Sequence, residues 1–261
     1  LQGALTDVDA LRDALGDDVG CLLLQQPNFL GAVEDAPALC EAAGAAGGLA
    51  VVSADPTSLG LLEAPGAYGA DICVGDGQAL GNHPHYGGPS FGFFAARESL
   101  IRRMPGRIVG ETTDADGRRG FVLTLQTREQ HIRREKATSN ICTNQALNAL
   151  GGVVYLSWLG PRGIAELGTQ CLSRAEYLKG RLAEVGAESA FPSPTFKEFT
   201  VRVGRSGDEV VRACRAKGVH PGYALGRDYP ELDDCLLVAV TEKRSRADLD
   251  RLADVLGEVL S

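Results

Sequence analysis

The stretch that decides the fold runs from residue 70 to residue 89 and reads Ala-Asp-Ile-Cys-Val-Gly-Asp-Gly-Gln-Ala-Leu-Gly-Asn-His-Pro-His-Tyr-Gly-Gly-Pro. Its first part, residues 71–74, is a short apolar run that predicts a buried strand. The spacing Gly75-x-Gly77-x-x-x-Gly81 also occurs in dinucleotide-binding loops, which follow a strand and open a helix. Here the prolines and glycines of residues 84–89 break any helical pattern, so a pyrophosphate would find no helix N-terminus. We therefore interpret the glycine-rich part as an irregular loop.

Alternating strands and helices surround this loop. Apolar runs at residues 20–25 and 49–54 predict strands, and the Ala- and Leu-rich segment 34–46 between them predicts a helix. Residues 90–95 predict a fourth strand. Strand, helix and strand in this order favour an α/β fold with a mainly parallel sheet and helices on its faces. Farther on, Asp114-Ala115-Asp116-Gly117 is a hairpin turn signal between the segments 107–112 and 121–125.

The second half begins with a long helix. It is predicted over residues 139–159, although three consecutive capping residues, Thr138, Ser139 and Asn140, leave its start open. Gly160-Pro161 closes this helix and opens a second, amphipathic one that reaches residue 185. The remaining segments predict strands at 199–203 and 236–240 and helices at 208–216 and 247–260.

Composition excludes several classes of function. The chain has 261 residues, a formal net charge of −8 and a pI of about 5.1, which argue against nucleic acid and anionic membranes as partners. No apolar run approaches the roughly 20 residues of a membrane span. The seven cysteines form no CxxC pair, so neither a zinc site nor a disulfide framework is indicated. The first residues lack a basic secretory signal, and we expect a cytoplasmic protein with reduced thiols.

Residues 70–89 resemble a segment of the P-protein of the glycine cleavage system, glycine dehydrogenase (decarboxylating). In the catalytic version of that family, an Ala-Asp strand leads to a His-Lys pair and then to a Pro-His-Gly-Gly type of loop. The resemblance implies that this lysine carries pyridoxal phosphate as a Schiff base. Without gaps, the His-Lys pair falls on Gln78-Ala79, and alanine has no amine with which to form a Schiff base. We therefore expect no catalytic residue and no cofactor in this chain, with pyridoxal phosphate held by a partner subunit.

Other positions of the family site are also altered. Residues 25–31, Gln-Gln-Pro-Asn-Phe-Leu-Gly, match an Asn-Pro-Asn-x-x-Gly loop of the family. Asp55 lies in the region where the catalytic subunit has a Tyr-Asp-Gly-Ala segment, whose Asp pairs with the pyridine nitrogen; the register there is open by a residue or two. His85 falls near a loop histidine of the catalytic subunit. Together, Gln78, Ala79, His85 and Asp55 are interpreted as a degenerate site.

The most specific resemblance is the segment 128–143, Arg-Glu-Gln-His-Ile-Arg-Arg-Glu-Lys-Ala-Thr-Ser-Asn-Ile-Cys-Thr, which both subunit types share. Lys136 is a possible replacement for the missing lysine, but the catalytic chains carry it in addition to their own, which favours a structural or electrostatic role. Thr138 and Ser139 stand at the head of a predicted helix, where hydroxyls and free N–H groups bind anions. They are candidates for contacting the phosphate of the partner subunit's cofactor; an ordinary helix cap is the alternative.

Two further sets of residues have a structural and a functional interpretation. His83 and His85 would need a third ligand to hold a metal, so loop packing is favoured and no metal site is predicted. The remaining lysines, Lys179, Lys197, Lys217 and Lys243, are assigned to solvated surfaces.

The resemblance implies an aminotransferase-like fold, that of fold type I pyridoxal phosphate enzymes. Residues 1–135 would form the rear part of the large domain, 136–160 a connecting helix and 161–261 the small C-terminal domain. Because the family carries a long segment before the part seen here, the chain is expected to be a C-terminal fragment. It would be the cofactor-less subunit, often called subunit 1, and would complete the site of the catalytic subunit 2, which acts on glycine and the lipoylated H-protein. A purely structural subunit, or an enzyme that uses another lysine, are the alternatives.

Overall fold

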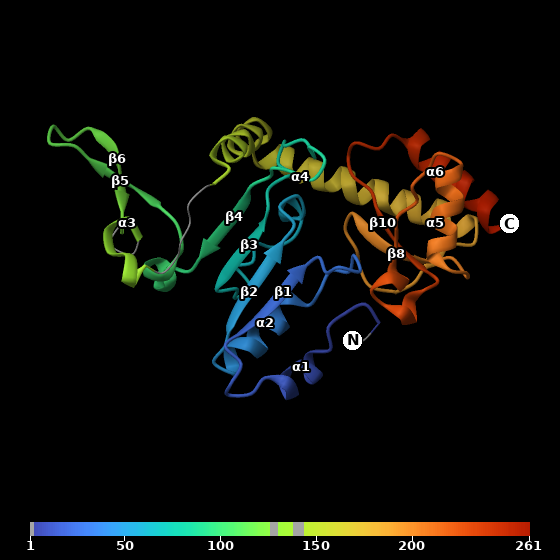
Figure 1. The fold of residues 1–261 in the computed structure, drawn as a ribbon, viewed down its shortest axis with the longest axis horizontal. Helices are drawn as coiled ribbons and strands as arrows, with labels where there is room; N and C mark the ends of the chain where they lie inside the picture. Colours follow the sequence, from blue (N-terminus) through green and yellow to red (C-terminus); the bar gives the residue numbers. More distant parts are fainter. Residues whose placement is uncertain (1–2, 126–129, 138–143) are drawn as a thin grey trace.

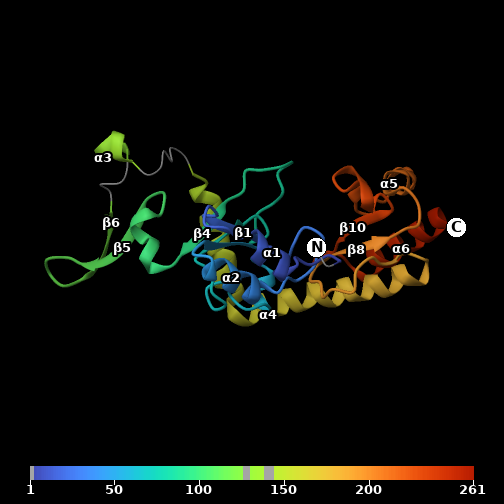
Figure 2. The same ribbon diagram turned by 90° about the horizontal axis from the view of Figure 1, so that it is seen from below.

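The structure, a computed structural model, describes residues 3–125, 130–137 and 144–261. Two sheets lie side by side and a long helix connects them, as Figure 1 shows. The larger sheet is built from the first hundred residues, and the smaller one from the last hundred or so. Figure 2 shows that the long helix runs beneath both sheets. The chain therefore has the mixed α/β architecture that the alternating pattern predicts.

Four strands form the large sheet in the order β1-β2-β3-β4. The parallel strands are β1 (Cys21–Gln26), β2 (Leu49–Ala54) and β3 (Ile72–Asp76). The last strand, β4 (Gly92–Ala96), returns antiparallel to β3. The carboxyl ends of three strands therefore meet at one edge, where sheets of this type bind ligands.

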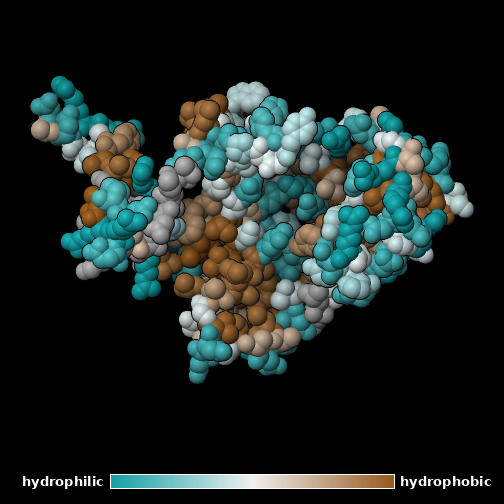
Figure 3. All heavy atoms as spheres, in the orientation of Figure 1, coloured by the Kyte–Doolittle hydropathy of each residue, from teal (hydrophilic) through white to brown (hydrophobic). Residues whose placement is uncertain are grey.

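Only one face of the large sheet is covered in the described part of the chain. Helix α2 (Ala36–Ala45) packs against β1 and β2, and α1 (Val8–Ala14) packs against α2. Leu24 and Val52 point into this core, whereas Leu23 on the opposite face is 76% exposed. Figure 3 shows a broad apolar area over the large sheet. The predicted helices on the faces of the sheet are therefore seen on one face within the described residues.

The long helix α4 (Ala146–Glu184) is broken at Gly160, whose φ of 61° lies outside the helical region. Gly160-Pro161 is the predicted break, because proline removes a helical hydrogen bond and is favoured at a first helical position. The sequence leaves the start of this helix open, and the predicted helical range 139–159 is wrong at Asn144 and Gln145, which are not helical; α4 begins at Ala146. Its second half buries an apolar stripe that consists of Leu167, Cys171, Ala175, Leu178 and Leu182.

The small sheet is antiparallel, with the order β7-β8-β10-β9. Its central strands are β8 (Glu198–Arg202) and β10 (Cys235–Ala239), and β7 (Glu188–Ser189) and β9 (Tyr223–Ala224) lie at its edges. Helices α5 (Gly207–Ala216) and α6 (Arg246–Leu260) pack with the second half of α4 on this sheet.

A hairpin projects away from the body of the molecule in Figure 1. It consists of β5 (Ile108–Thr113) and β6 (Arg119–Thr124), joined by the predicted turn, and short helix α3 (Gln130–Arg133) follows it. Within the described residues, no helix is both long and apolar enough to cross a membrane.

Candidate functional site

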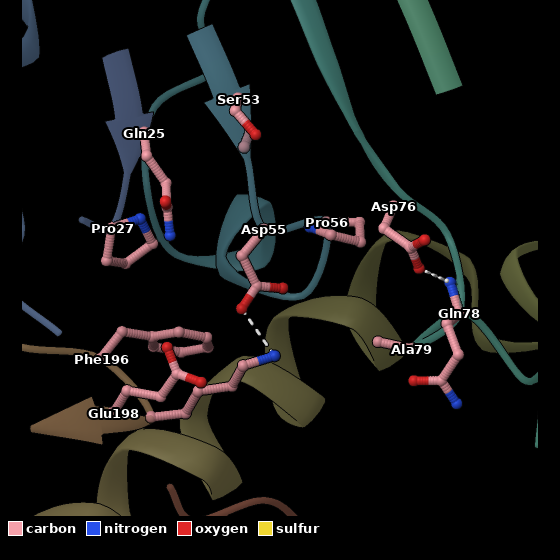
Figure 4. A pocket seen from close by; sticks show the side chains of 12 residues that line it. Gln25, Pro27, Ser53, Asp55, Pro56, Asp76, Gln78, Ala79, Phe196 and Glu198 are labelled. Atoms are coloured by element: carbon pink, nitrogen blue, oxygen red, sulfur yellow. Dashed lines mark hydrogen bonds and ion pairs between the residues drawn. The ribbon is translucent and has the colours of Figure 1, made fainter. Parts of the chain in front are cut away.

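A cavity of about 270 Å³ lies at the carboxyl ends of β1, β2 and β3. Its other wall comes from the residues at the start of β8, so both sheets contribute to it (Figure 4). Parallel strands commonly place binding sites at this edge. The lining residues are Gln25, Pro27, Ser53, Ala54, Asp55, Pro56, Asp76, Gln78, Ala79, Phe196, Lys197 and Glu198.

The turn after β3 places Ala79 in the cavity wall. Asp76, the last residue of β3, accepts hydrogen bonds from the Gln78 backbone N–H at 2.7 Å and from the Ser90 hydroxyl at 2.9 Å. These two bonds fix the direction in which the chain leaves the strand. A methyl group therefore stands at the position that the resemblance assigns to the cofactor lysine.

Asp55 follows β2 directly and uses both carboxylate oxygens. Its Oδ1 accepts from the Thr57 backbone N–H at 2.9 Å and from the Thr57 hydroxyl at 2.8 Å, which closes a local turn. Its Oδ2 lies 2.6 Å from Lys197 Nζ, and Lys197 also donates to Thr57 Oγ1 at 3.2 Å. The dashed line from Asp55 in Figure 4 marks this ion pair. Only 18% of the Lys197 side chain and 19% of the Asp55 side chain are exposed.

The loop after β1 holds the small sheet against this edge. At Gly31, with φ of 87°, an added Cβ would lie 2.3 Å from the Glu198 carbonyl oxygen, so only glycine permits the close approach. The Thr200 hydroxyl donates to the Leu30 carbonyl at 2.9 Å, and Val33 N–H donates to the Pro194 carbonyl at 2.8 Å. These contacts bring Lys197 and Glu198 into the cavity wall.

Acidic groups dominate the lining of the cavity. Burial raises the pKa of Glu198, and the nearby Lys197 ammonium opposes that shift. Asp76 is held by the hydrogen bonds described above, and Asp55 by the ion pair. Lys197 is the single basic side chain among the lining residues. The cavity is therefore suited to a cation rather than to an anion.

A second cavity of about 310 Å³ adjoins the first and shares Gln78, Ala79 and Lys197 with it. Cys171 lies in its wall and donates its thiol to Glu242 at 3.6 Å. Burial raises the pKa of the Cys171 thiol, which keeps it protonated and unreactive at neutral pH.

The structure brings together three of the four residues that the sequence assigns to a degenerate site. Gln78, Ala79 and Asp55 line one cavity, whereas His85 lies on an exposed loop and lines neither cavity. His83 and His85 have ring centroids 5.9 Å apart, and no metal-binding group was found among the described residues. The Lys136 side chain lies outside the described part of the structure, and so do the whole of Thr138 and Ser139.

The assignment of Lys197 and Lys179 to solvated surfaces is wrong, because only 18% and 16% of these side chains are exposed. The alternation of side chains along a strand could have revealed the burial of Lys197. Residues two apart face the same side of a sheet, and Phe199 and Val201, two and four residues farther on, are both buried. Nothing in the sequence indicates that Asp55, far away along the chain, is the partner of Lys197.

This arrangement of a mainly parallel sheet, a long connecting helix and a small antiparallel sheet is the fold of type I pyridoxal phosphate enzymes. The structure matches an alanine–glyoxylate aminotransferase from Nostoc sp. with a TM-score of 0.66 at 21% identity, over 99% of this chain and 67% of that chain. It matches a crystal structure of glycine decarboxylase (P-protein) of the glycine cleavage system with a TM-score of 0.87 at 47% identity, over 94% of this chain and 56% of that one.

Sequence comparisons define the family. The profile described as glycine cleavage system P-protein matches residues 4–256. A protein of Geobacillus kaustophilus (strain HTA426) named "Probable glycine dehydrogenase (decarboxylating) subunit 1" is 51% identical over 98% of this chain and 57% of its own length. A protein of the same name from Chlorobium luteolum is 52% identical over 99% of this chain and 58% of its own length. The chain belongs to the glycine cleavage system P-protein family, and it spans less than two thirds of the length of these relatives.

The residues of the cavity do not fit pyridoxal phosphate. Ala79 offers no amine, and the Lys197 amine is engaged by Asp55 and Thr57. Asp55, the candidate partner of a pyridine nitrogen, is occupied by the same lysine. A phosphate group prefers cationic partners, but the charged groups among the lining residues are three carboxyl groups and one ammonium that is already paired; Gln25, Gln78 and Ser53 add only neutral donors. We therefore derive no chemistry through this cofactor in the cavity.

Proposed function

We propose that this chain is part of the non-lysine-bearing subunit of a P-protein that decarboxylates glycine and transfers the aminomethyl group to a lipoylated carrier protein. The single observation that carries the proposal is Ala79, which lines a cavity at the carboxyl ends of the parallel strands and stands where the resemblance assigns the cofactor lysine. Pyridoxal phosphate, which supplies an electron sink for decarboxylation, would be held by a companion subunit. Thr138 and Ser139 remain candidates for contacting its phosphate, as a prediction.

In this proposal, the chain holds its companion and completes the companion's site. The name "subunit 1" of its relatives supports an assembly with a second kind of subunit. The alternative is a purely structural subunit that contributes only an interface, and the internal pairing of Asp55 with Lys197 favours it, because this pairing leaves the cavity without a free cation.

Reconstitution tests the proposal. The complete natural polypeptide and a lysine-bearing companion would be assayed, separately and mixed, for exchange of the glycine carboxyl group with labelled bicarbonate in the presence of lipoylated carrier protein. We expect exchange only from the mixture. After borohydride reduction, mass spectrometry should place the cofactor adduct on the companion and none on Lys136 or Lys197. Full activity of the companion alone would contradict a role of this chain in completing the site and would favour the purely structural subunit. A stoichiometric cofactor adduct on this chain would contradict both functions.

A further inference from the structure

Lys197 forms an ion pair that links the two sheets. Asp55 directly follows β2 of the large sheet, and Lys197 directly precedes β8 of the small sheet. Their charged atoms are 2.6 Å apart and largely screened from solvent. Exposed ion pairs contribute little to stability, but removal of one partner from a screened pair leaves an uncompensated charge, which is costly. This contact is therefore more than a surface pair.

The charges around the cavity explain why a cation is needed at this place. Asp76 already accepts from a backbone N–H and from a hydroxyl, and burial favours the neutral acid at Glu198. Asp55 receives hydrogen bonds on Oδ1 only from Thr57. Its Oδ2 faces the cavity, where Lys197 is the one basic lining residue. Without Lys197, a carboxylate would face a confined space in which none of the described lining residues carries a positive charge.

We propose that Lys197 is the resident cation of this cavity: its ammonium group occupies the place beside Asp55 that a positively charged ring nitrogen or another organic cation would otherwise take, and it fastens the small sheet to the large one. The proposal holds whatever reaction the assembly catalyses. It also implies that two residues, rather than one, close the cavity to a cofactor. Ala79 removes the point of covalent attachment, and the Lys197 ammonium fills the place beside Asp55.

Chemical rescue tests this proposal directly. Lys197→Ala, made in the complete natural polypeptide, removes three methylene groups and the ammonium group, which together correspond to n-propylammonium. We expect the melting temperature to fall by roughly 4–10 °C, because Asp55 loses its cation. Addition of n-propylammonium chloride should restore most of that loss in a saturable way, by mass action on the folded state. Sodium chloride at the same ionic strength should not.

Two control variants, and a second pair of variants in case the first does not fold, make the test specific. In Lys197→Ala/Asp55→Asn, the amide keeps the turn to Thr57 but carries no charge, so n-propylammonium should have no effect. Lys243→Ala removes a lysine of the second cavity and should show no rescue. If Lys197→Ala does not fold, Lys197→Met keeps the aliphatic stem, and Lys197→Met/Asp55→Asn should then melt at a higher temperature than Lys197→Met. Any of three results would overturn the proposal. The melting temperature could be unchanged in both Lys197→Ala and Lys197→Met, or n-propylammonium could still stabilise Lys197→Ala/Asp55→Asn. The third such result is a melting temperature of Lys197→Met/Asp55→Asn no higher than that of Lys197→Met.

Discussion

Two side chains, Ala79 and Lys197, determine what the cavity at the end of the large sheet can do. The methyl group of Ala79 provides no nucleophile and no proton donor at the position where the resemblance implies a lysine. Lys197 has an amine, but this amine is held by Asp55 at 2.6 Å and by Thr57 at 3.2 Å. Among the described residues that line this cavity, no amine is therefore free to form a Schiff base.

Ser245 and Asp248, at the start of α6, make the stability of the folded protein depend on pH. Ser245 caps α6: Asp248 N–H donates to the Ser245 hydroxyl oxygen, and Asp248 Oδ2 accepts from the Ser245 N–H at 2.9 Å. These bonds to Ser245 lower the pKa of Asp248 below its usual value of 3.8. Because the folded-state pKa is the lower one, the contribution to stability is complete above 3.8 and is lost as the pH falls through the folded-state value.

We expect Asp248→Asn to destabilise the protein at pH 6 and to have much less effect at pH 2.5. Ser245→Ala removes the hydroxyl partner and should cost about 1 kcal/mol at pH 6. Urea unfolding of the wild type and of both variants at the two pH values gives the comparison. A loss of stability in Asp248→Asn that is equally large at both pH values would contradict the assignment.

At the scale of elements, the loop after β3 is fixed by a contact between Phe91 and two glycines. The Phe91 ring lies between Gly77 and Gly152: a Cβ added at Gly77 would meet it at 2.3 Å, and one added at Gly152 at 2.4 Å. Gly152 lies in the first half of α4, so this contact joins the helix to the loop that bears Ala79. Glycine, normally unfavourable in a helix, is required there because the ring leaves no room for a side chain.

Replacement by alanine at the adjacent glycines Gly151 and Gly152 of α4 should therefore change the free energy of unfolding in opposite directions. Gly152→Ala forces the Phe91 ring to move, and we expect a loss of about 1–3 kcal/mol in the free energy of unfolding. At Gly151, the nearest atom to an added Cβ is 3.9 Å away, so Gly151→Ala should gain up to about 1 kcal/mol from helix propensity. Chemical denaturation of both variants measures the difference. Equal effects at the two positions would show that the Phe91 contact does not restrict Gly152.

The same elements show what the sequence could and could not predict. The periodicity of apolar residues predicts β1, β2, β3 and the break in α4, because these features depend on local pattern and on proline chemistry. The two-residue strands β7 and β9 have no local signal, since pairing with longer neighbours creates them. The Lys197–Asp55 pair is a tertiary contact between distant residues, and a single sequence does not record which distant residues meet.

At the scale of the whole molecule, the first half of α4 is an apolar helix without a covering layer in the described part of the chain. It contains no charged residue between Ala146 and Gly160. Leu147 is 80% exposed, Val154 60% and Trp158 82%. With Gly151, these residues recur at spacings of three and four, so they form one stripe along the helix. A helix that is apolar on every side is normally buried, and so this surface should drive association.

We therefore expect the 261-residue chain to self-associate in solution and to bind dyes that report exposed apolar surface. Replacing Leu147 and Trp158 together by Gln should shift sedimentation toward the monomer and lower dye binding, because it interrupts the stripe at both ends. Tyr86 is the control: it is fully exposed on the loop after β3 and does not belong to the stripe, so Tyr86→Gln should leave association unchanged. Sedimentation velocity over a range of concentrations measures the effect. A compact monomer without dye binding would contradict the prediction, and equal effects of the two replacements would place the associating surface elsewhere than on α4.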